Sequence, residues 1–124
     1  MDQATIEIHT FCETVSELLG DVLDEKGFTF RRGDFGEDFA QCDFRSADAD
    51  LRFVLKRRDG EVNCLIKYPK HGTKTDWVYL TKYMNFGSGM SEKELIDATD
   101  VRTGSIRESL SFYGPLLCKL WALR

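Results

Sequence analysis

Cysteine and histidine are the first candidates for chemistry, because they serve as nucleophiles, proton carriers and metal ligands. The chain has four cysteines, which are Cys12, Cys42, Cys64 and Cys118. No two of them are close enough in sequence to form a metal knuckle or a C-x-x-C redox pair. Each lies in an apolar-patterned segment. The sequence therefore predicts four reduced thiols that behave as small buried hydrophobic side chains.

The two histidines lack an evident catalytic or metal-binding setting. His9 falls on the edge of an apolar helical stripe, where we expect it to pack or cap, and His71 lies in the basic loop KHGTKTD at residues 70–76. No G-x-S-x-G, H-E-x-x-H or phosphate-loop motif occurs. We therefore expect no catalytic residue, no metal and no cofactor. An enzyme of unknown reaction stays an alternative, because catalytic groups converge in space rather than in sequence.

Acidic side chains are concentrated at the start of the chain. Residues 1–27 carry seven acids and one base, a net charge of −6 against −4 for the whole sequence. Either a solvated helix face or a surface for a basic protein partner would account for this excess, because the fields of like charges add. The turn GDFGED at residues 33–38 adds acids without the spacing of a calcium loop. The predicted partner-binding residues are Glu13, Glu17, Asp21, Asp24, Asp34, Glu37 and Asp38.

Basic and aromatic side chains are interleaved farther along the chain and define an alternative binding face. Residues 28–90 hold eleven bases and nine acids. A basic sheet with aromatic platforms is one way to bind single-stranded RNA. The acidic overall charge opposes polyanion binding, so a nucleic acid or a small molecule is the alternative ligand and a protein is the preferred one. The residues of this alternative face are Trp77, Tyr79, Tyr83, Arg52, Lys56 and Lys67.

The elements that position these residues centre on the stretch DLRFVLKRRDGEVNCLIKY at residues 50–68. Its Asp-Gly dipeptide is a strong signal for a two-residue hairpin turn, because both residues tolerate positive φ. That turn would set Phe53 opposite Ile66 on an apolar face. It would set Arg52 opposite Lys67 on an exposed, mostly basic face, since successive side chains alternate between faces.

Apolar periodicity and turn signals predict the other elements. These are a helix at residues 5–26, strands at 28–32, 39–45 and 77–84, a short helix from Ser91, and a last helix after Ser105 that is interrupted at Gly114-Pro115. Gly27 is a natural residue to follow the last turn of the first helix. In the last strand, alternation assigns Val78, Leu80 and Met84 to the core and leaves the aromatic side chains at least partly outward.

Together these elements predict one α+β domain over residues 1–124. Consecutive strands with short turns favour an antiparallel meander of about five strands, with an N-terminal and a C-terminal helix packed on one face. No apolar run approaches the roughly 20 residues of a membrane span. The first residues do not resemble a signal peptide, so we expect a cytoplasmic protein. The sequence leaves a homo-oligomer open.

Three stretches carry a resemblance to a known group of proteins. They are EKGF at the end of the first helix, VLKRRDGEVNCLI in the strands, and LCKLWALR in the last helix. Their layout resembles that of the small bacterial immunity proteins of polymorphic toxin systems and of related α+β proteins. The likeness covers most of the chain but concerns the order of elements, so it transfers no functional residue. It implies a non-catalytic protein that sequesters a basic toxin, often a nuclease, through acidic surface.

Overall fold

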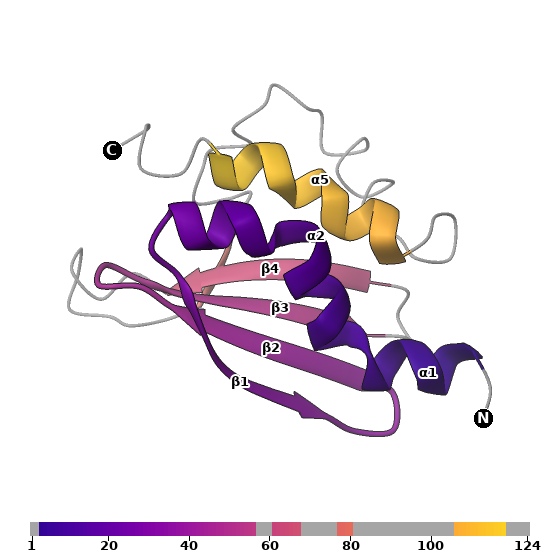
Figure 1. Ribbon diagram of the computed structural model, residues 1–124. Helices are drawn as coiled ribbons and strands as arrows, with labels where there is room; N and C mark the ends of the chain where they lie inside the picture. The colour runs from indigo at the N-terminus through magenta and orange to yellow at the C-terminus, as the bar shows by residue number, and fades with distance from the viewer. Residues whose placement is uncertain (1–2, 57–60, 68–76, 81–105, 119–124) are drawn as a thin grey trace.

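The computed structural model places two helices, α2 (Phe11–Glu25) and α5 (Ile106–Cys118), over one face of a five-stranded sheet. It describes residues 3–56, 61–67, 77–80 and 106–118. The two helices lie side by side above the sheet, and a short helix, α1 (Gln3–His9), leads into α2 (Figure 1). Among the helices of these ranges, none is both long and apolar enough to span a membrane.

The sheet is an antiparallel meander, because each strand pairs with the next one in sequence. Its strands are β1 (Thr29–Phe35), β2 (Phe39–Arg45), β3 (Asp50–Lys56), β4 (Glu61–Lys67) and β5 (Val78–Tyr79). Short connections favour pairing between consecutive strands. The predicted α+β class, the meander and the placement of both helices on one face are confirmed.

The first helical segment is divided at Thr10, whereas the sequence predicts one helix over residues 5–26. The Thr10 hydroxyl donates a 2.8 Å hydrogen bond to the carbonyl of Ile6, which also accepts the Thr10 amide at 3.0 Å. A hydroxyl bonded to the carbonyl four residues back can bend a helix, but the Thr14 hydroxyl bonds to the Thr10 carbonyl in the same way, at 3.0 Å, inside the unbroken α2. The backbone leaves helical geometry at Thr10, with φ of −102° and ψ of 6°. Apolar periodicity carries no trace of this break, so the prediction of a single helix is wrong.

The end of α2 follows the prediction, with Gly27 beyond the last turn. Gly27 has φ of +84°, a conformation that glycine adopts without a steric penalty. The Phe28 amide donates to the Leu23 carbonyl at 2.8 Å, and the Gly27 amide donates to the Asp24 carbonyl at 3.0 Å. These two bonds form a Schellman motif. Phe28 is buried, so the chain turns sharply from the helix into β1.

The last helix runs through Pro115, although the Gly114-Pro115 pair predicts an interruption. α5 continues unbroken to Cys118. Proline removes an amide donor and is costly inside a helix. On either side of it, Leu110 and Leu117 are fully buried where α5 packs on α2 and β4. Tertiary packing of the apolar stripe therefore holds the helix together across the proline.

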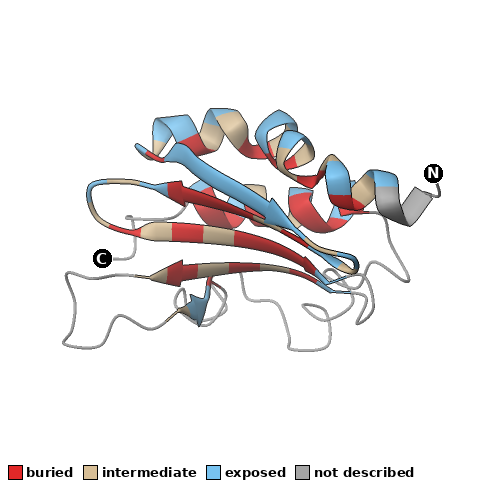
Figure 2. Cartoon of the chain, turned by 90° about the horizontal axis from the view of Figure 1, so that it is seen from below, coloured by how far each residue is buried: buried red, intermediate tan, exposed pale blue. Residues whose placement is uncertain are grey.

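The core fills the space between the helices and the sheet. The buried side chains of α2 are Phe11, Val15, Leu19 and Leu23, and those of β3 on this face are Leu51, Phe53 and Leu55. The ring of Phe53 meets Phe44 edge-on at 5.9 Å and Tyr113 at 6.3 Å between centroids. Figure 2 shows buried positions recurring along the middle strands, whereas β1 is exposed along its whole length.

The hairpin of β3 and β4 has the predicted faces but a different register. Phe53 lies opposite Cys64, and Ile66 lies opposite Leu51. The sequence predicted Phe53 opposite Ile66, which is wrong by two residues on one strand. A slip of two residues leaves every side chain on its face, so Phe53 and Ile66 are both buried as expected. The expected two-residue turn at Asp59-Gly60 lies outside the described residues.

The other face of the hairpin is less exposed than predicted. Arg52 lies opposite Leu65, not Lys67. Both Arg52 and Lys67 are only partly exposed. The indole of Trp77 explains this, because the Arg52 guanidinium carbon lies 4.2 Å from its centroid and the Lys67 ammonium lies 5.9 Å from it.

Two strand predictions need correction. β1 continues to Phe35, beyond the predicted end at residue 32. Val78 is exposed, not part of the core. Its strand lies at an edge of the sheet, and the helices make their main sheet contacts with β1, β2 and β4. Leu80 is fully buried as expected, but β5 ends at Tyr79, so Leu80 is not part of the predicted strand at residues 77–84; Met84 lies outside the described residues.

Candidate functional site

The acidic side chains of α2 form one exposed stripe, which we call the acidic face: Glu13, Glu17, Asp21 and Asp24. All four are exposed. Their spacing places them on one side of a helix with 3.6 residues per turn, opposite the buried stripe. With Glu25, the helix holds five acids and no base. Like charges three or four residues apart repel each other, so this face is electrostatically unfavourable in the isolated protein.

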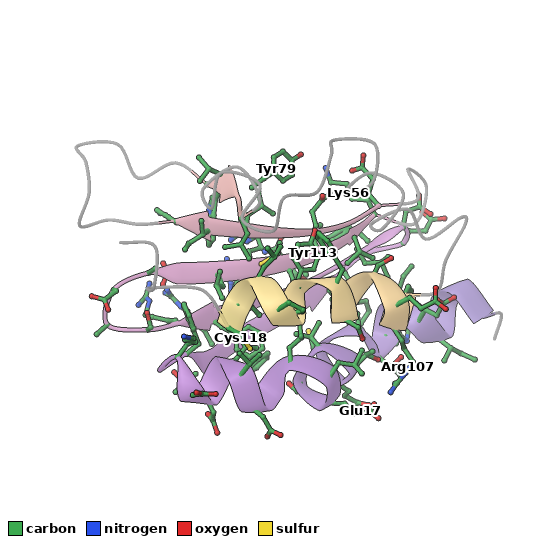
Figure 3. The ribbon with its side chains drawn as sticks, turned by 90° about the horizontal axis from the view of Figure 1, so that it is seen from above. Glu17, Lys56, Tyr79, Arg107, Tyr113 and Cys118 are labelled. Atoms are coloured by element: carbon green, nitrogen blue, oxygen red, sulfur yellow. The ribbon has the colours of Figure 1, made fainter. Side chains whose placement is uncertain are left out.

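One member of the acidic face has a basic partner. Arg107 on α5 donates from Nη1 to Oε2 of Glu17 at 3.0 Å and from Nη2 to Oε1 at 3.1 Å. Figure 3 shows the two side chains meeting between the helices. These hydrogen bonds lower the pKa of Glu17 and raise that of Arg107. Across the described ranges, no ion pair reaches Glu13, Asp21 or Asp24.

The remaining predicted acids do not extend this face as one surface. Asp34 lies in β1 beside Gly33, the residue that approaches Cys12 of α2. Because successive strand residues point to opposite faces, Asp34 points away from the helices, and its Oδ1 accepts the Phe35 amide at 2.9 Å. Glu37 and Asp38 lie in the turn between β1 and β2, where Glu37 is exposed and Asp38 is partly buried.

A basic hollow of about 260 Å³ lies on the face of the sheet opposite the helices. It is lined by residues of β1, β2, β3 and β4 and by Trp77 just before β5. Its basic residues are Arg31, Arg32, Arg45, Arg52 and Lys67, and its acidic residues are Asp43 and Asp50. The side chains that line the hollow therefore carry a net charge of +3.

Asp43 is the centre of the hydrogen bonding in the hollow. Its Oδ1 accepts Arg52 Nε at 2.9 Å, and its Oδ2 accepts Arg52 Nη2 at 3.2 Å and Arg32 Nε at 3.4 Å. The residue is only 6% exposed. A carboxylate buried to this degree requires charged partners, because an unpaired buried charge is strongly destabilising. Asp43 therefore anchors the Arg52 guanidinium through two hydrogen bonds and makes one longer contact with Arg32, whose side chain is 66% exposed.

A second ion pair lies next to the first one on the same strands. Arg45 Nε donates to Asp50 Oδ1 at 2.8 Å and Arg45 Nη2 to Asp50 Oδ2 at 3.5 Å. In the register of β2 and β3, Arg45 faces Asp50 directly, and Asp43 faces Arg52 two residues away. In one pair the arginine is on β2 and in the other it is on β3. Arg45 and Arg52 therefore lie diagonally across the two strands.

The hollow brings together three of the six residues of the predicted basic and aromatic face: Trp77, Arg52 and Lys67. Lys56 and Tyr79 are exposed but do not line it, and Tyr83 lies outside the described residues. The sequence reasoning missed the contributions of Asp43 and Asp50, and it counted Arg32 and Arg45 among the eleven bases of residues 28–90 without assigning them to this face. Charged residues alternate with apolar ones in both middle strands, and this pattern signals that they share the outer face.

The thiols differ in their surroundings. Cys42 and Cys64 are buried as predicted, Cys12 is half-buried, and Cys118 is exposed, which corrects the expectation of four buried thiols. Burial raises the pKa of Cys64. The neighbouring Cys12 thiol and burial raise the pKa of Cys42, and the hydrogen bond with Cys42 lowers that of Cys12. All four are free thiols.

The histidine of the described region has a packing role. The ring of His9 lies 4.5 Å from that of Phe35, centroid to centroid, which agrees with the prediction that it packs or caps. His71 lies outside the described residues. Within the described ranges, no three histidine, cysteine or acidic side chains are grouped in a way that would hold a metal ion.

Comparison with known proteins adds no relative. The sequence matches no protein-family model, no curated protein and no solved structure.

Proposed function

We propose that this chain is a non-catalytic module that binds a basic protein partner through the acidic face. The observation that carries the proposal is the set of carboxylates on α2, of which only Glu17 has an ion-pair partner among the described residues. Such a stripe opposes folding slightly through repulsion between like charges. A basic partner would convert that repulsion into attraction.

The helix beneath the acidic face is well anchored, which favours fast and specific association. Phe11, Val15, Leu19 and Leu23 of α2 are almost completely buried. A rigid helix presents its carboxylates in one arrangement, so less conformational entropy is lost when a partner binds. Clustered charge of one sign also raises the rate of encounter with an oppositely charged protein by roughly 10–10³-fold at low salt.

The resemblance in the layout of elements supports a more specific proposal. The partner would be a basic toxin, such as a nuclease, and the chain would be its cytoplasmic immunity protein. An acidic helix is suited to this task, because a surface that binds nucleic acid is rich in lysine and arginine. On this proposal, the protein neutralises the toxin by covering its basic surface and performs no turnover.

The test compares charge reversals after a partner has been isolated by pull-down. The variant Glu13→Lys/Asp21→Lys/Asp24→Lys leaves Glu17 in place, so the contact with Arg107 on α5 is kept. The association rate should fall by about tenfold or more at low salt, with a weaker dependence on ionic strength. Biolayer interferometry at several salt concentrations measures both quantities.

Single reversals supply a matched control. Asp21→Lys and Glu61→Lys change the net charge equally, and both residues are exposed, but Glu61 lies at the start of β4. Slower association for Asp21→Lys alone would support the acidic face. Equal rates for the two variants, or an unchanged rate for the triple variant with its fold intact by circular dichroism, would refute it.

A further inference from the structure

The basic hollow holds more positive charge than its own acids neutralise. Five bases and two acids line a volume of about 260 Å³. Concave surfaces lined by one sign of charge focus the electric field, and low-dielectric walls strengthen the effect. The excess positive charges repel each other in this space, and binding of an anion would relieve that repulsion.

The guanidinium groups are positioned before any ligand binds. Asp43 bonds to Nε and Nη2 of Arg52, and within the described part of the chain no group accepts a hydrogen bond from Nη1. Asp50 bonds to the same two nitrogens of Arg45. Guanidinium donors that are already fixed lose little freedom on binding an oxyanion, and hydrogen bonds between ionised groups are about twice as strong as neutral ones.

Trp77 closes one side of the hollow and orders two of its cations. The guanidinium of Arg52 lies over the indole at 4.2 Å from the ring centroid, and the Lys67 ammonium lies at 5.9 Å. Contact with an aromatic face stabilises a cation electrostatically. The ring also covers part of the Arg52 side chain, which is 23% exposed, so the charge of Arg52 is less screened than at an open surface.

We infer that the basic hollow binds the phosphate group of a small phosphorylated molecule. Phosphate carries up to two negative charges and accepts hydrogen bonds in several directions, which suits donors that come from three neighbouring strands at Arg45, Arg52 and Lys67. Sites for drug-sized ligands have volumes of about 300–1,000 Å³. The hollow is slightly smaller than this range, so its ligand is small. The net charge of −4 for the whole chain disfavours a long polyanion such as RNA as the source of the phosphate.

The test is a titration of the full chain followed by ¹H–¹⁵N NMR at constant ionic strength, with sodium chloride as the balancing salt. The probes are inorganic phosphate, glycerol 3-phosphate, acetate and a single-stranded oligonucleotide. Phosphate and glycerol 3-phosphate should shift the Trp77 indole and Lys67 amide signals saturably, with a Kd of about 1 mM or lower. Acetate should bind at least about tenfold more weakly, because it carries one charge and two acceptors.

Two lysines on the same sheet face give a matched pair of variants. Lys67→Gln removes a base that lines the hollow, whereas Lys56→Gln removes a base outside it. Phosphate binding should weaken by about tenfold for Lys67→Gln, as expected for a lost charged hydrogen bond, and by less than about twofold for Lys56→Gln. If Lys67→Gln does not fold, Arg31→Gln replaces it, since Arg31 lines the hollow from an exposed position.

The titrations and the lysine variants each have an outcome that would contradict phosphate binding in the basic hollow. Equal losses in the two lysine variants, or phosphate shifts no larger than those of chloride, would overturn the inference. Tighter binding of the oligonucleotide than of glycerol 3-phosphate would overturn the choice of a small molecule as the source of the phosphate. Loss of partner binding in the acidic-face variants would leave the phosphate result unchanged, because the two sites lie on opposite faces of the sheet.

Discussion

At the scale of single residues, Cys64 illustrates how burial links protonation to stability. Its side chain lies in the core on β4, directly opposite Phe53. Burial raises the pKa of this thiol well above the ordinary value of 9.0, because the thiolate would lose its hydration. In the unfolded chain the thiol regains its ordinary pKa. Between the two values the unfolded state releases a proton that the folded state keeps, so stability falls as pH rises.

Part of the alkaline loss of stability should therefore depend on Cys64. The contribution of the buried thiol is present below the ordinary thiol pKa of 9.0 and declines above it by about 1.4 kcal/mol for each pH unit. Cys64→Ala removes this contribution. Between pH 8 and pH 10 the unfolding free energy of the variant should therefore fall by about 1.4 kcal/mol less than that of the original protein. Urea unfolding under reducing conditions measures it. Cys118→Ala, which removes an exposed thiol, should leave the slope unchanged, and an equal effect in both variants would contradict the assignment.

At the scale of elements, α2 approaches the edge strand β1 closely where Cys12 faces Gly33. An ideal Cβ at Gly33 on β1 would lie 2.7 Å from the Cys12 sulfur on α2. That distance is too short for two non-bonded atoms, and Cys12 has a short side chain whose sulfur donates to the Gln41 carbonyl at 3.5 Å. The close approach of helix and strand therefore depends on glycine at this position.

Gly33→Ala should destabilise the protein by about 1–3 kcal/mol, the usual range for overpacking. Adding Cys12→Ala removes the sulfur that clashes, so the double variant should recover part of the loss. A double-mutant cycle in denaturant measures the coupling between the two positions. Gly36→Ala is the control, because its new methyl group would meet the ring of Phe39, a side chain that is 39% exposed, and not an atom packed between the helix and the strand. If Gly36→Ala lowered the unfolding free energy as much as Gly33→Ala, the clash with Cys12 would not be the cause of the destabilisation.

At the scale of the whole molecule, charge of opposite sign lies on opposite sides of the sheet. α2 carries a net charge of −5 on the helical side, and the basic hollow carries +3 on the other side. Each side is self-repelling. The exposed ion pair between Glu17 and Arg107 joins the two helices but contributes little, because both partners are solvated.

Salt should therefore stabilise this protein. Raising sodium chloride from about 10 mM to about 150 mM shortens the screening length from about 30 Å to about 8 Å and weakens repulsion within each side. The unfolding free energy should rise by about 0.5–1 kcal/mol, on the scale of a few like-charge helix pairs. Thermal and urea unfolding measure the change. The variant Glu13→Gln/Asp21→Asn should respond less to salt, whereas a fall in stability on adding salt would show that attractive pairs dominate.

Much of the architecture follows from local pattern. The alternation in residues 50–56 and 61–67 determines which side chains face the core, because a strand has a period of two. The helical spacing of apolar residues in α2 and the glycine at residue 27 determine where the helix lies and where it ends. The exposure of Glu13, Asp21 and Asp24 follows from the same periodicity.

Other features depend on contacts between distant residues, and sequence reasoning missed them. The register of β3 and β4 differs from the prediction by two residues, because a slip of two preserves the faces and therefore leaves no mark in the pattern. The break at Thr10 is a local departure of the backbone from helical geometry that leaves the apolar spacing intact, and the continuity of α5 through Pro115 reflects tertiary packing.

The basic hollow is the clearest example of a feature that only the tertiary structure decides. By itself, the sequence determined that Arg52 and Lys67 share a face and that α2 has an acidic side. It did not determine that Asp43 of β2 holds Arg52 of β3 and Arg32 of β1, or that Trp77 lies over the Arg52 guanidinium. Alternation sets the face of each residue along one strand. Which residues become neighbours across four strands depends on register, and register is selected by the packing of the whole sheet.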